Sequence, residues 1–182
     1  MKTIINEIPS HSQFYKGEKG LEVGYPWLTL GAIYSLERIL GRRKTLRVLE
    51  LGGGGSTVFF SRRAKKVITL EHNPDWVDRI KEALPTPSNV KIVQDTEEKL
   101  LDYVEKRPDG YYDIVLVDSG PNYVSRAKML KASAIKVKRY GWLIIDNYAN
   151  CDRNFDYTGF DVFTFDMFQY SGRGTRLCKK LY

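Results

Sequence analysis

The sequence predicts an α/β fold in which a mainly parallel sheet carries helices on both faces. Short apolar runs, rich in β-branched residues, alternate with helical patterns, and this alternation repeats four times along the chain. Because parallel strands are joined by right-handed crossovers, we expect a doubly wound sheet. The last two strand-like runs are separated by Ser-Gly-Arg-Gly, which is typical of an antiparallel hairpin.

Five apolar runs have the length and composition of strands buried on both faces. They span 46–51, 67–70, 90–93, 114–117 and 143–145. Between them, helical spacing gives three apolar faces, formed by Trp76, Ile80 and Leu84; by Leu100, Leu101 and Val104; and by Val124, Ala127, Leu130, Ala134 and Val137. We also expect a helix over 27–40, ended by Gly41, and hairpin strands within 160–170 and 175–182. Asp113 comes before its strand and is interpreted as structural.

Length and composition favour one domain. The chain has 182 residues, 42% of them hydrophobic, which is enough for one core and short for two domains. We expect a single domain over 1–182, with 1–26 as an N-terminal cover segment that includes His11 and 27–182 as the core. The net charge of +7 favours anionic partners but also serves solubility. Cys151 and Cys178 have no disulfide or metal spacing, and no run is apolar enough for a signal peptide or a membrane helix. We therefore expect a cytoplasmic protein without a membrane partner.

Four consecutive glycines follow the first predicted strand, in the stretch LRVLELGGGGSTVFF at 46–60. In an open parallel sheet, ligands bind beyond the carboxyl ends of the strands, and the first strand-to-helix turn is the usual cradle. Gly52 and Gly54 would let the backbone turn tightly and approach a ligand. Glu71 ends the second run, 19 residues after Gly52, which is close to the spacing of an acid that binds ribose. These features predict a nucleoside site, against the alternative of a simple tight turn.

The glycine stretch departs from the dinucleotide-binding pattern, because Thr57 stands at the third glycine position and Glu50 precedes the turn. Glu50-Leu51-Gly52-Gly53-Gly54-Gly55-Ser56-Thr57 resembles motif I of the Rossmann-like, S-adenosylmethionine-dependent methyltransferases, and the resemblance covers residues 27–182. It implies a seven-stranded sheet that ends with an antiparallel hairpin, and S-adenosylmethionine as the cofactor. The implied cofactor-binding residues are Glu50, Gly52, Gly53, Gly54, Ser56, Thr57, Glu71, His72, Asp95, Thr96 and Asp118.

The resemblance also implies a role for each acid. Glu71, with His72 beside it, would bind the ribose, and Asp95 and the Thr96 amide would lie near the adenine amine. Asp118 would face the methyl donor and the substrate. Glu50 would orient the glycine turn or contact the amino group of the cofactor's methionine moiety, and these two roles are compatible.

A second resemblance concerns DSGPNY at 118–123 and GWLIIDNY at 141–148, which are similar to the cation-dependent O-methyltransferases that act on catechol or caffeoyl-coenzyme A. It implies that Asp118, Asp146 and Asn147 hold a magnesium ion, and hard oxygen ligands suit that ion. The sequence departs from that family at Pro121, where the family has a lysine base. The alternative is that the Asp-Asn pair caps a turn. Without a metal, Asp118 or Asp146 would be the catalytic base, or the reaction would rely mainly on placing the nucleophile in line with the methyl group.

The acceptor is constrained mainly by what is missing from the sequence. Asp146-Asn147-Tyr148 lacks the prolines of enzymes that methylate amino groups of DNA bases, and the basic clusters at 62–66 and 173–180 resemble solvated surfaces. We therefore favour O-methylation of a small-molecule or carrier-bound substrate. An RNA or nucleoside methyltransferase, a dehydrogenase on the same fold, and a non-catalytic module that binds the cofactor remain as alternatives. The aromatic run at 160–170 suggests a homodimer.

Overall fold

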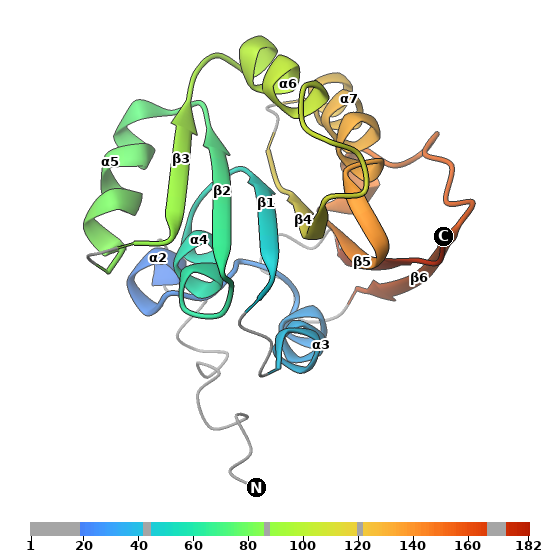
Figure 1. Ribbon diagram of the computed structural model, residues 1–182, viewed down its shortest axis with the longest axis horizontal. Helices are drawn as coiled ribbons and strands as arrows, with labels where there is room; N and C mark the ends of the chain where they lie inside the picture. The colour runs from blue at the N-terminus through green and yellow to red at the C-terminus, as the bar shows by residue number, and fades with distance from the viewer. Residues whose placement is uncertain (1–18, 42–44, 86–87, 120–121, 167–173) are drawn as a thin grey trace, which may run out of the picture.

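The computed structural model describes residues 19–41, 45–85, 88–119, 122–166 and 174–182 (Figure 1). Within these ranges seven strands form one sheet, in the order β3-β2-β1-β4-β5-β7-β6. The strands are β1 (Arg47–Leu51), β2 (Lys66–Glu71), β3 (Val90–Gln94), β4 (Tyr112–Val117), β5 (Val137–Asp146), β6 (Phe160–Phe165) and β7 (Thr175–Lys180). The predicted seven-stranded sheet is confirmed.

The first five strands are parallel, whereas β7 runs antiparallel to both β5 and β6. The predicted C-terminal hairpin is therefore confirmed, although 167–173, which include most of its turn, lie outside the described residues. Because β1 to β5 point the same way, their carboxyl ends meet at one edge of the sheet (Figure 1). This edge is where the sequence placed the candidate site.

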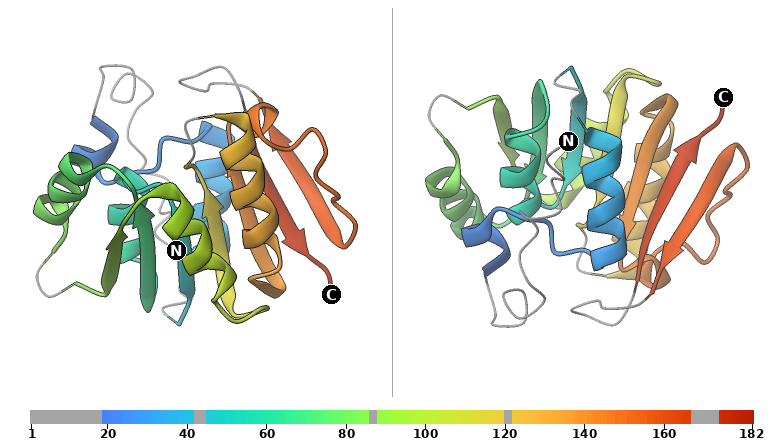
Figure 2. Two further views of the ribbon diagram at one scale, coloured as in Figure 1. Left: turned by 90° about the horizontal axis from the view of Figure 1, so that it is seen from above. Right: turned by 90° about the horizontal axis from the view of Figure 1, so that it is seen from below.

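Helices cover both faces of the sheet, as predicted (Figure 2). They are α2 (Lys19–Val23), α3 (Leu30–Leu40), α4 (Gly55–Ser61), α5 (Pro74–Ala83), α6 (Glu97–Glu105) and α7 (Tyr123–Ala134). Successive side chains of β1 show why two layers form, since Val48 packs with α3 and α4 while Leu49 packs with α6 and α7. Each fully buried side chain of this kind contributes about 2 kcal/mol through removal of apolar surface from water.

Two predicted helices differ in detail from the structure. The helix expected over 27–40 begins at Leu30, because the backbone amide of Thr29 donates to the Thr175 hydroxyl at 3.2 Å and Thr29 stays extended. Its end at Gly41 is as predicted. The apolar face expected on α7 was partly wrong, since Val124 is 60% exposed and Val137 already belongs to β5. Arg126 lies on the buried face of α7 instead.

Asp113 is the second residue of β4, so its predicted place before the strand was wrong. Its carboxylate accepts a hydrogen bond from the backbone amide of Arg47 at 2.8 Å and pairs with Lys138. These contacts join the beginnings of β1, β4 and β5, far from the carboxyl edge, and agree with a structural role. β5 also begins earlier than expected, because it continues past an irregularity in its pairing with β4.

The N-terminal part of the chain is described only from Lys19 onward, so His11 and most of the expected cover segment lie outside the described residues. The part that is described places α2 against α4. In the described portions of the chain, no helix combines the length and the apolar character needed to cross a membrane.

Candidate active site

Backbone hydrogen bonds bring the ends of three neighbouring strands together at the carboxyl edge. Gly52, directly after β1, donates its amide to the carbonyl of Leu70 in β2 at 2.8 Å. The amide of Asp118, directly after β4, donates to the carbonyl of Leu51 at 2.8 Å. The glycine turn therefore lies between Glu71, which ends β2, and Asp118.

Three of the four glycines are required by the packing of the chain itself. Gly52 has φ +87°, and a Cβ there would lie 2.6 Å from the carbonyl oxygen of Asp118. At Gly53 a Cβ would come within 2.6 Å of Ile80, and at Gly55 within 2.1 Å of the Tyr25 carbonyl oxygen.

Gly54 differs from the other three, because its nearest neighbour would be Trp76 at 3.7 Å, an ordinary contact. A Cβ at Gly54 would therefore fit against the Trp76 ring without a clash. This bare stretch of backbone is the part of the turn that a ligand can approach.

Glu50 is a fully buried acid directly beneath the turn. Its Oε2 accepts hydrogen bonds from the hydroxyls of Thr57 at 2.6 Å and Thr69 at 2.7 Å. Its Oε1 is buried and has no hydrogen-bond partner among the described residues. Burial raises the pKa of Glu50 to about 7, against the opposing effect of the hydroxyls of Ser56, Thr57 and Thr69. An unsatisfied buried carboxylate oxygen fits a site that receives a cationic group from a ligand.

Glu71 is held in place at the end of β2 by backbone donors. Its Oε2 accepts from the Gly53 amide and its Oε1 from the Asn73 amide, both at 2.9 Å. His72 lies with its Nδ1 3.3 Å from Glu71 Oε1, and its own side chain is 48% exposed. The structure thus joins Glu71 directly to the glycine turn and leaves His72 at the rim of the site.

Trp76 is a residue of the site that the sequence analysis missed. Its indole Nε1 donates to the carbonyl oxygen of Gly53 at 2.6 Å, and the ring lies beside Gly54. The guanidinium of Arg79 stacks over the same ring at 4.6 Å from its centroid. The sequence analysis counted Trp76 only as part of an apolar helical face, and the tryptophan's single polar atom was the signal that could have identified it.

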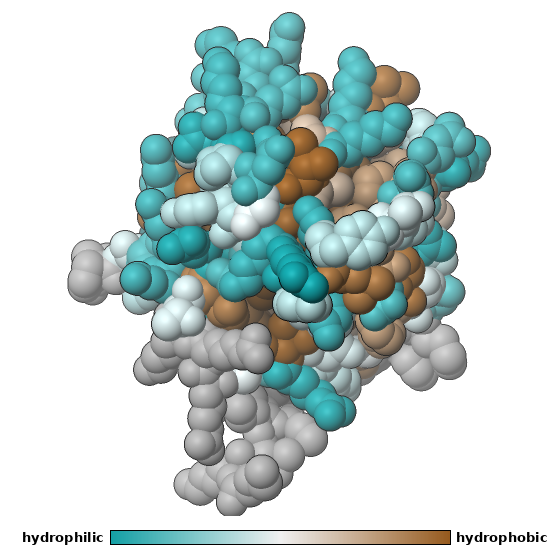
Figure 3. All heavy atoms as spheres, turned by 45° about the vertical axis from the view of Figure 1, so that its right-hand side comes forward, coloured by the Kyte–Doolittle hydropathy of each residue, from teal (hydrophilic) through white to brown (hydrophobic). Residues whose placement is uncertain are grey.

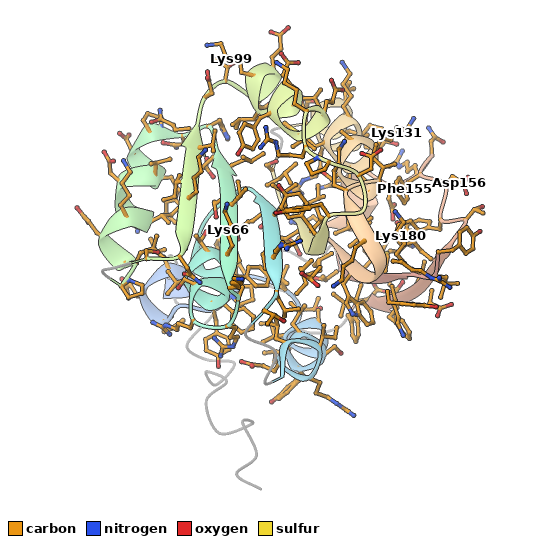
Figure 4. The ribbon with its side chains drawn as sticks, in the orientation of Figure 1. Lys66, Lys99, Lys131, Phe155, Asp156 and Lys180 are labelled. Carbon is orange, nitrogen blue, oxygen red and sulfur yellow. The ribbon has the colours of Figure 1, made fainter. Side chains whose placement is uncertain are left out.

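Asp95 and Thr96 follow β3 as expected, but their polar groups contact each other and a lysine. The Asp95 carboxylate accepts from the Thr96 amide at 2.9 Å and pairs with Lys99 at 3.2 Å. The amide, followed by Lys99, lowers the pKa of Asp95. Lys99 projects at the upper edge of the molecule in Figure 4, so this carboxylate is engaged at the solvent-exposed rim.

Asp118 and Asp146 form a pair of carboxyl groups at the ends of β4 and β5. Asp118 is 31% exposed at its side chain, whereas Asp146 is buried. Burial and then the negative charge of Asp118 raise the pKa of Asp146 to about 8. Burial also raises the pKa of Asp118, against the opposing charge of Arg126. One group of the pair thus faces solvent while the other lies behind it.

Arg126 and Thr175, which no sequence pattern had singled out, hold this pair together with Asn147. Arg126 Nη2 donates to Asp118 Oδ1 at 2.7 Å, and the Thr175 hydroxyl donates to Asp146 Oδ1 at 3.1 Å. Asn147, in the left-handed conformation at φ +48°, donates its Nδ2 to Asp146 Oδ2 at 2.6 Å. A buried arginine on an otherwise apolar helix face was the available signal for Arg126.

The residues of this site fit S-adenosylmethionine, which the first resemblance implies, but not the magnesium ion that the second resemblance implies. The orphaned Oε1 of Glu50, the uncrowded backbone at Gly54 and the ordered Glu71 suit a nucleoside with a cationic amino group. The three predicted magnesium ligands do not fit their ion, since Arg126 binds Asp118, and Asn147 presents its amino group to Asp146. Among the described residues, no cluster of three or more His, Cys, Asp or Glu side chains could hold a metal. Pro121, at the family's lysine position, lies outside the described residues.

Comparisons with known proteins bear on the family and the fold of the chain. The family model described as a methyltransferase domain matches residues 49–148, more than half of the chain. No curated protein matches the sequence.

Solved structures of similar fold include a candidate O-methyltransferase from Klebsiella pneumoniae, with TM-score 0.66, 16% identity, and coverage of 98% of this chain and 94% of that one. Another is SMU.1697c, a candidate methyltransferase from Streptococcus mutans in complex with S-adenosylhomocysteine, with TM-score 0.61, 18% identity, and coverage of 82% of this chain and 97% of that one. A third is an rRNA methylase from Streptococcus thermophilus, with TM-score 0.61, 15% identity, and coverage of 83% and 96%. At these identities the structures show a shared fold. The family match includes β4, β5 and the glycine turn, and this chain therefore belongs to the Rossmann-like, S-adenosylmethionine-dependent methyltransferases.

Proposed function

We propose that this methyltransferase transfers the methyl group of S-adenosylmethionine to an oxygen atom of a small or carrier-bound acceptor. The observation that carries the proposal is the carboxyl pair, Asp118 and Asp146, beside the glycine turn. A hydroxyl must lose its proton as it is methylated, and a carboxylate whose pKa is raised is a better acceptor for that proton than an ordinary carboxylate. Asp118 is the member of the pair that solvent reaches.

The proposed cofactor site uses the residues around the turn. Glu50 Oε1 would receive the ammonium of the methionine moiety, and Glu71 would accept from the ribose hydroxyls with the lone pairs that Gly53 and Asn73 leave free. We place the donor along the Gly54 part of the turn, where a Cβ would meet only Trp76, at 3.7 Å. The hydroxyls of Thr57 and Ser56 hydrogen-bond to Glu50 and hold its carboxylate in place.

The proposed reaction needs little from the protein beyond placement and one proton acceptor. Bound S-adenosylmethionine supplies an electrophilic methyl group on its sulfonium sulfur. The acceptor oxygen forms the new C–O bond as the S–CH3 bond breaks, and the hydroxyl proton passes to the Asp118 carboxylate. Asp146 lies behind Asp118, where burial raises the pKa of Asp118 and a side-chain hydrogen bond between the two carboxyl groups opposes that rise.

The placement of the basic side chains supports a small acceptor over RNA. Lys66 begins β2, so the basic cluster at 62–66 lies at the opposite end of the strand from Glu71 (Figure 4). Within that cluster Arg63 is bound to Glu37 at 2.7 Å. In the C-terminal cluster Arg176 pairs with Asp152. A nucleic acid held by the cluster at 62–66 would therefore not lie over the proposed site.

We also propose a cytoplasmic location. Cys151 and Cys178 are both buried and free, although two cysteines could have formed one disulfide. Free cysteines are usual in a reducing compartment.

Acceptor-dependent formation of S-adenosylhomocysteine tests the proposal. The protein is incubated with S-adenosylmethionine and, in separate reactions, with a simple phenol, a catechol, a coenzyme A-bound hydroxy acid, and RNA. We expect S-adenosylhomocysteine to form with a hydroxyl acceptor. Asp118→Asn should abolish its formation. The control Asp156→Asn should not, because Asp156 is exposed and lies away from the carboxyl edge of the sheet (Figure 4). Product with RNA alone would contradict the acceptor class, and cofactor binding without any turnover would favour a non-catalytic module.

A further inference from the structure

Arg126 lies between the two strand ends that carry the predicted magnesium ligands. Its Nη2 donates to Asp118 Oδ1 at 2.7 Å, and its Nε donates to the carbonyl oxygen of Ser119 at 3.0 Å. Its Nη1 reaches the carbonyl oxygen of Asp146 at 3.5 Å. The guanidinium therefore joins the end of β4 to the end of β5.

The surroundings of Arg126 show that it is a built part of the site. It is 8% exposed, and α7 turns this charged residue inward on the same face as Met129 and Leu130. A charged side chain is buried at such a position only when it is paired and hydrogen-bonded, and three oxygens provide those contacts.

Asp146 is also supplied with protein donors on both of its oxygens. The Thr175 hydroxyl donates to Oδ1 at 3.1 Å and the Asn147 amide to Oδ2 at 2.6 Å. A cation held by the three predicted ligands would share the Asp118 carboxylate with Arg126, and the Asn147 side chain would have to turn so that its amide oxygen faced the ion. It would also lie within a few ångströms of a buried guanidinium, where two like charges repel strongly because little water screens them.

We propose that the guanidinium of Arg126 takes the place of the divalent cation in this site. The arginine is a positioning residue: it holds the Asp118 carboxylate against the end of β5 and supplies the positive charge that a metal supplies in the cation-dependent enzymes. This inference rests on the proposed function in assigning the site to methyl transfer.

A fixed guanidinium has a consequence for the substrate class. A metal ion can bind two vicinal oxygens of a catechol at once, because it offers several open coordination positions. The guanidinium of Arg126 has no open coordination positions, and it already donates to Asp118, Ser119 and Asp146 with three of its five N–H groups. The acceptor is therefore a molecule with a single reacting hydroxyl, for which a vicinal second oxygen gives no advantage.

Binding of Mn²⁺, a paramagnetic substitute for Mg²⁺, tests the proposal without any acceptor. Free Mn²⁺ is measured by electron paramagnetic resonance with the full-length protein, Arg126→Gln, and the control Lys131→Gln, which removes an exposed charge from the same helix (Figure 4). We expect weak binding by the wild-type protein and the control. Arg126→Gln, which leaves the carboxyl pair without its cation, should bind Mn²⁺ about tenfold or more tightly. The added substitution Asp118→Asn should abolish that gain.

Two results would overturn the proposal. One is tight Mn²⁺ binding by the wild-type protein that Asp118→Asn removes. The other is a folded Arg126→Gln, checked by circular dichroism, that binds Mn²⁺ no better than wild type. Should that variant not fold, the wild-type measurement alone decides. Calorimetric titration with S-adenosylhomocysteine on the same samples separates the two proposals, since absence of that binding speaks against the proposed function and not against the role of Arg126.

Discussion

Glu50→Gln should change how the stability of the protein depends on pH. In the folded protein burial raises the pKa of Glu50 from 4.5 to about 7, so the folded state binds more protons than the unfolded state between these two values. The stability of the wild-type protein therefore falls as the pH rises through this window, because a charge must then form in a buried place. A shift of this size corresponds to about 3 kcal/mol between the two protonation states.

Glutamine has the same shape as glutamate and never ionises, so the stability of Glu50→Gln does not fall in this way as the pH rises. Urea unfolding of both proteins between about pH 5 and pH 8.5 should show the free energy of unfolding of Glu50→Gln rising relative to wild type by about 2 to 3 kcal/mol. Comparison at each pH cancels the other titrating groups, which include Asp146. A difference that does not change with pH would refute the conclusion that Glu50 is a buried, titrating acid.

Three further predictions concern packing and assembly. Gly55→Ala should destabilise the fold, since its Cβ would lie 2.1 Å from a carbonyl oxygen. Gly54→Ala should unfold thermally like wild type yet lose S-adenosylhomocysteine binding. Equal effects of the two substitutions would contradict a packing role for Gly55 and a ligand-facing role for Gly54. Thr175→Val should cost about 1 to 3 kcal/mol in urea unfolding, because Asp146 and the Thr29 amide each lose a buried partner, and the exposed Thr164→Val is its control. β6 is an edge strand with Val162 39% and Phe163 47% exposed, and the side of the molecule that Figure 3 brings forward shows hydrophobic side chains among hydrophilic ones. Sedimentation should therefore show a dimer that Phe163→Lys dissociates. A wild-type protein that is monomeric at working concentrations would exclude this dimer.

Most of the sheet could be predicted because strands buried on both faces leave a simple pattern in the sequence. The runs around Val48, Ile68, Val115 and Ile144 are almost uninterrupted apolar residues, and each became a parallel strand. The faces of the helices were harder to predict. On α7 the periodicity pointed to Val124, whereas an ion pair with Asp118 turns Arg126 inward. The spacing of apolar residues along α7 does not predict the contact of Arg126 with Asp118, which directly follows β4.

The site was predictable at the level of strand ends and less so at the level of contacts. The fixed polarity of parallel strands dictates that Glu71, Asp118 and Asp146 share one edge. The partners Thr69 and Thr175 could not be predicted, because each reaches the site through tertiary packing from its own strand. Local sequence patterns likewise do not predict that three of the four glycines lack room for a Cβ because neighbouring elements pack against them. Only at Gly54 would a Cβ meet no atom closer than 3.7 Å.

The most direct test of the account is calorimetric titration of S-adenosylhomocysteine into the wild-type protein, Glu71→Ala, and the control Glu82→Ala, an exposed acid on α5. We predict affinity of about micromolar for the wild type and the control, and loss of binding in a folded Glu71→Ala. No binding by the wild-type protein would contradict the central claim that the carboxyl edge of this sheet, around Glu50, Gly54 and Glu71, is the cofactor site.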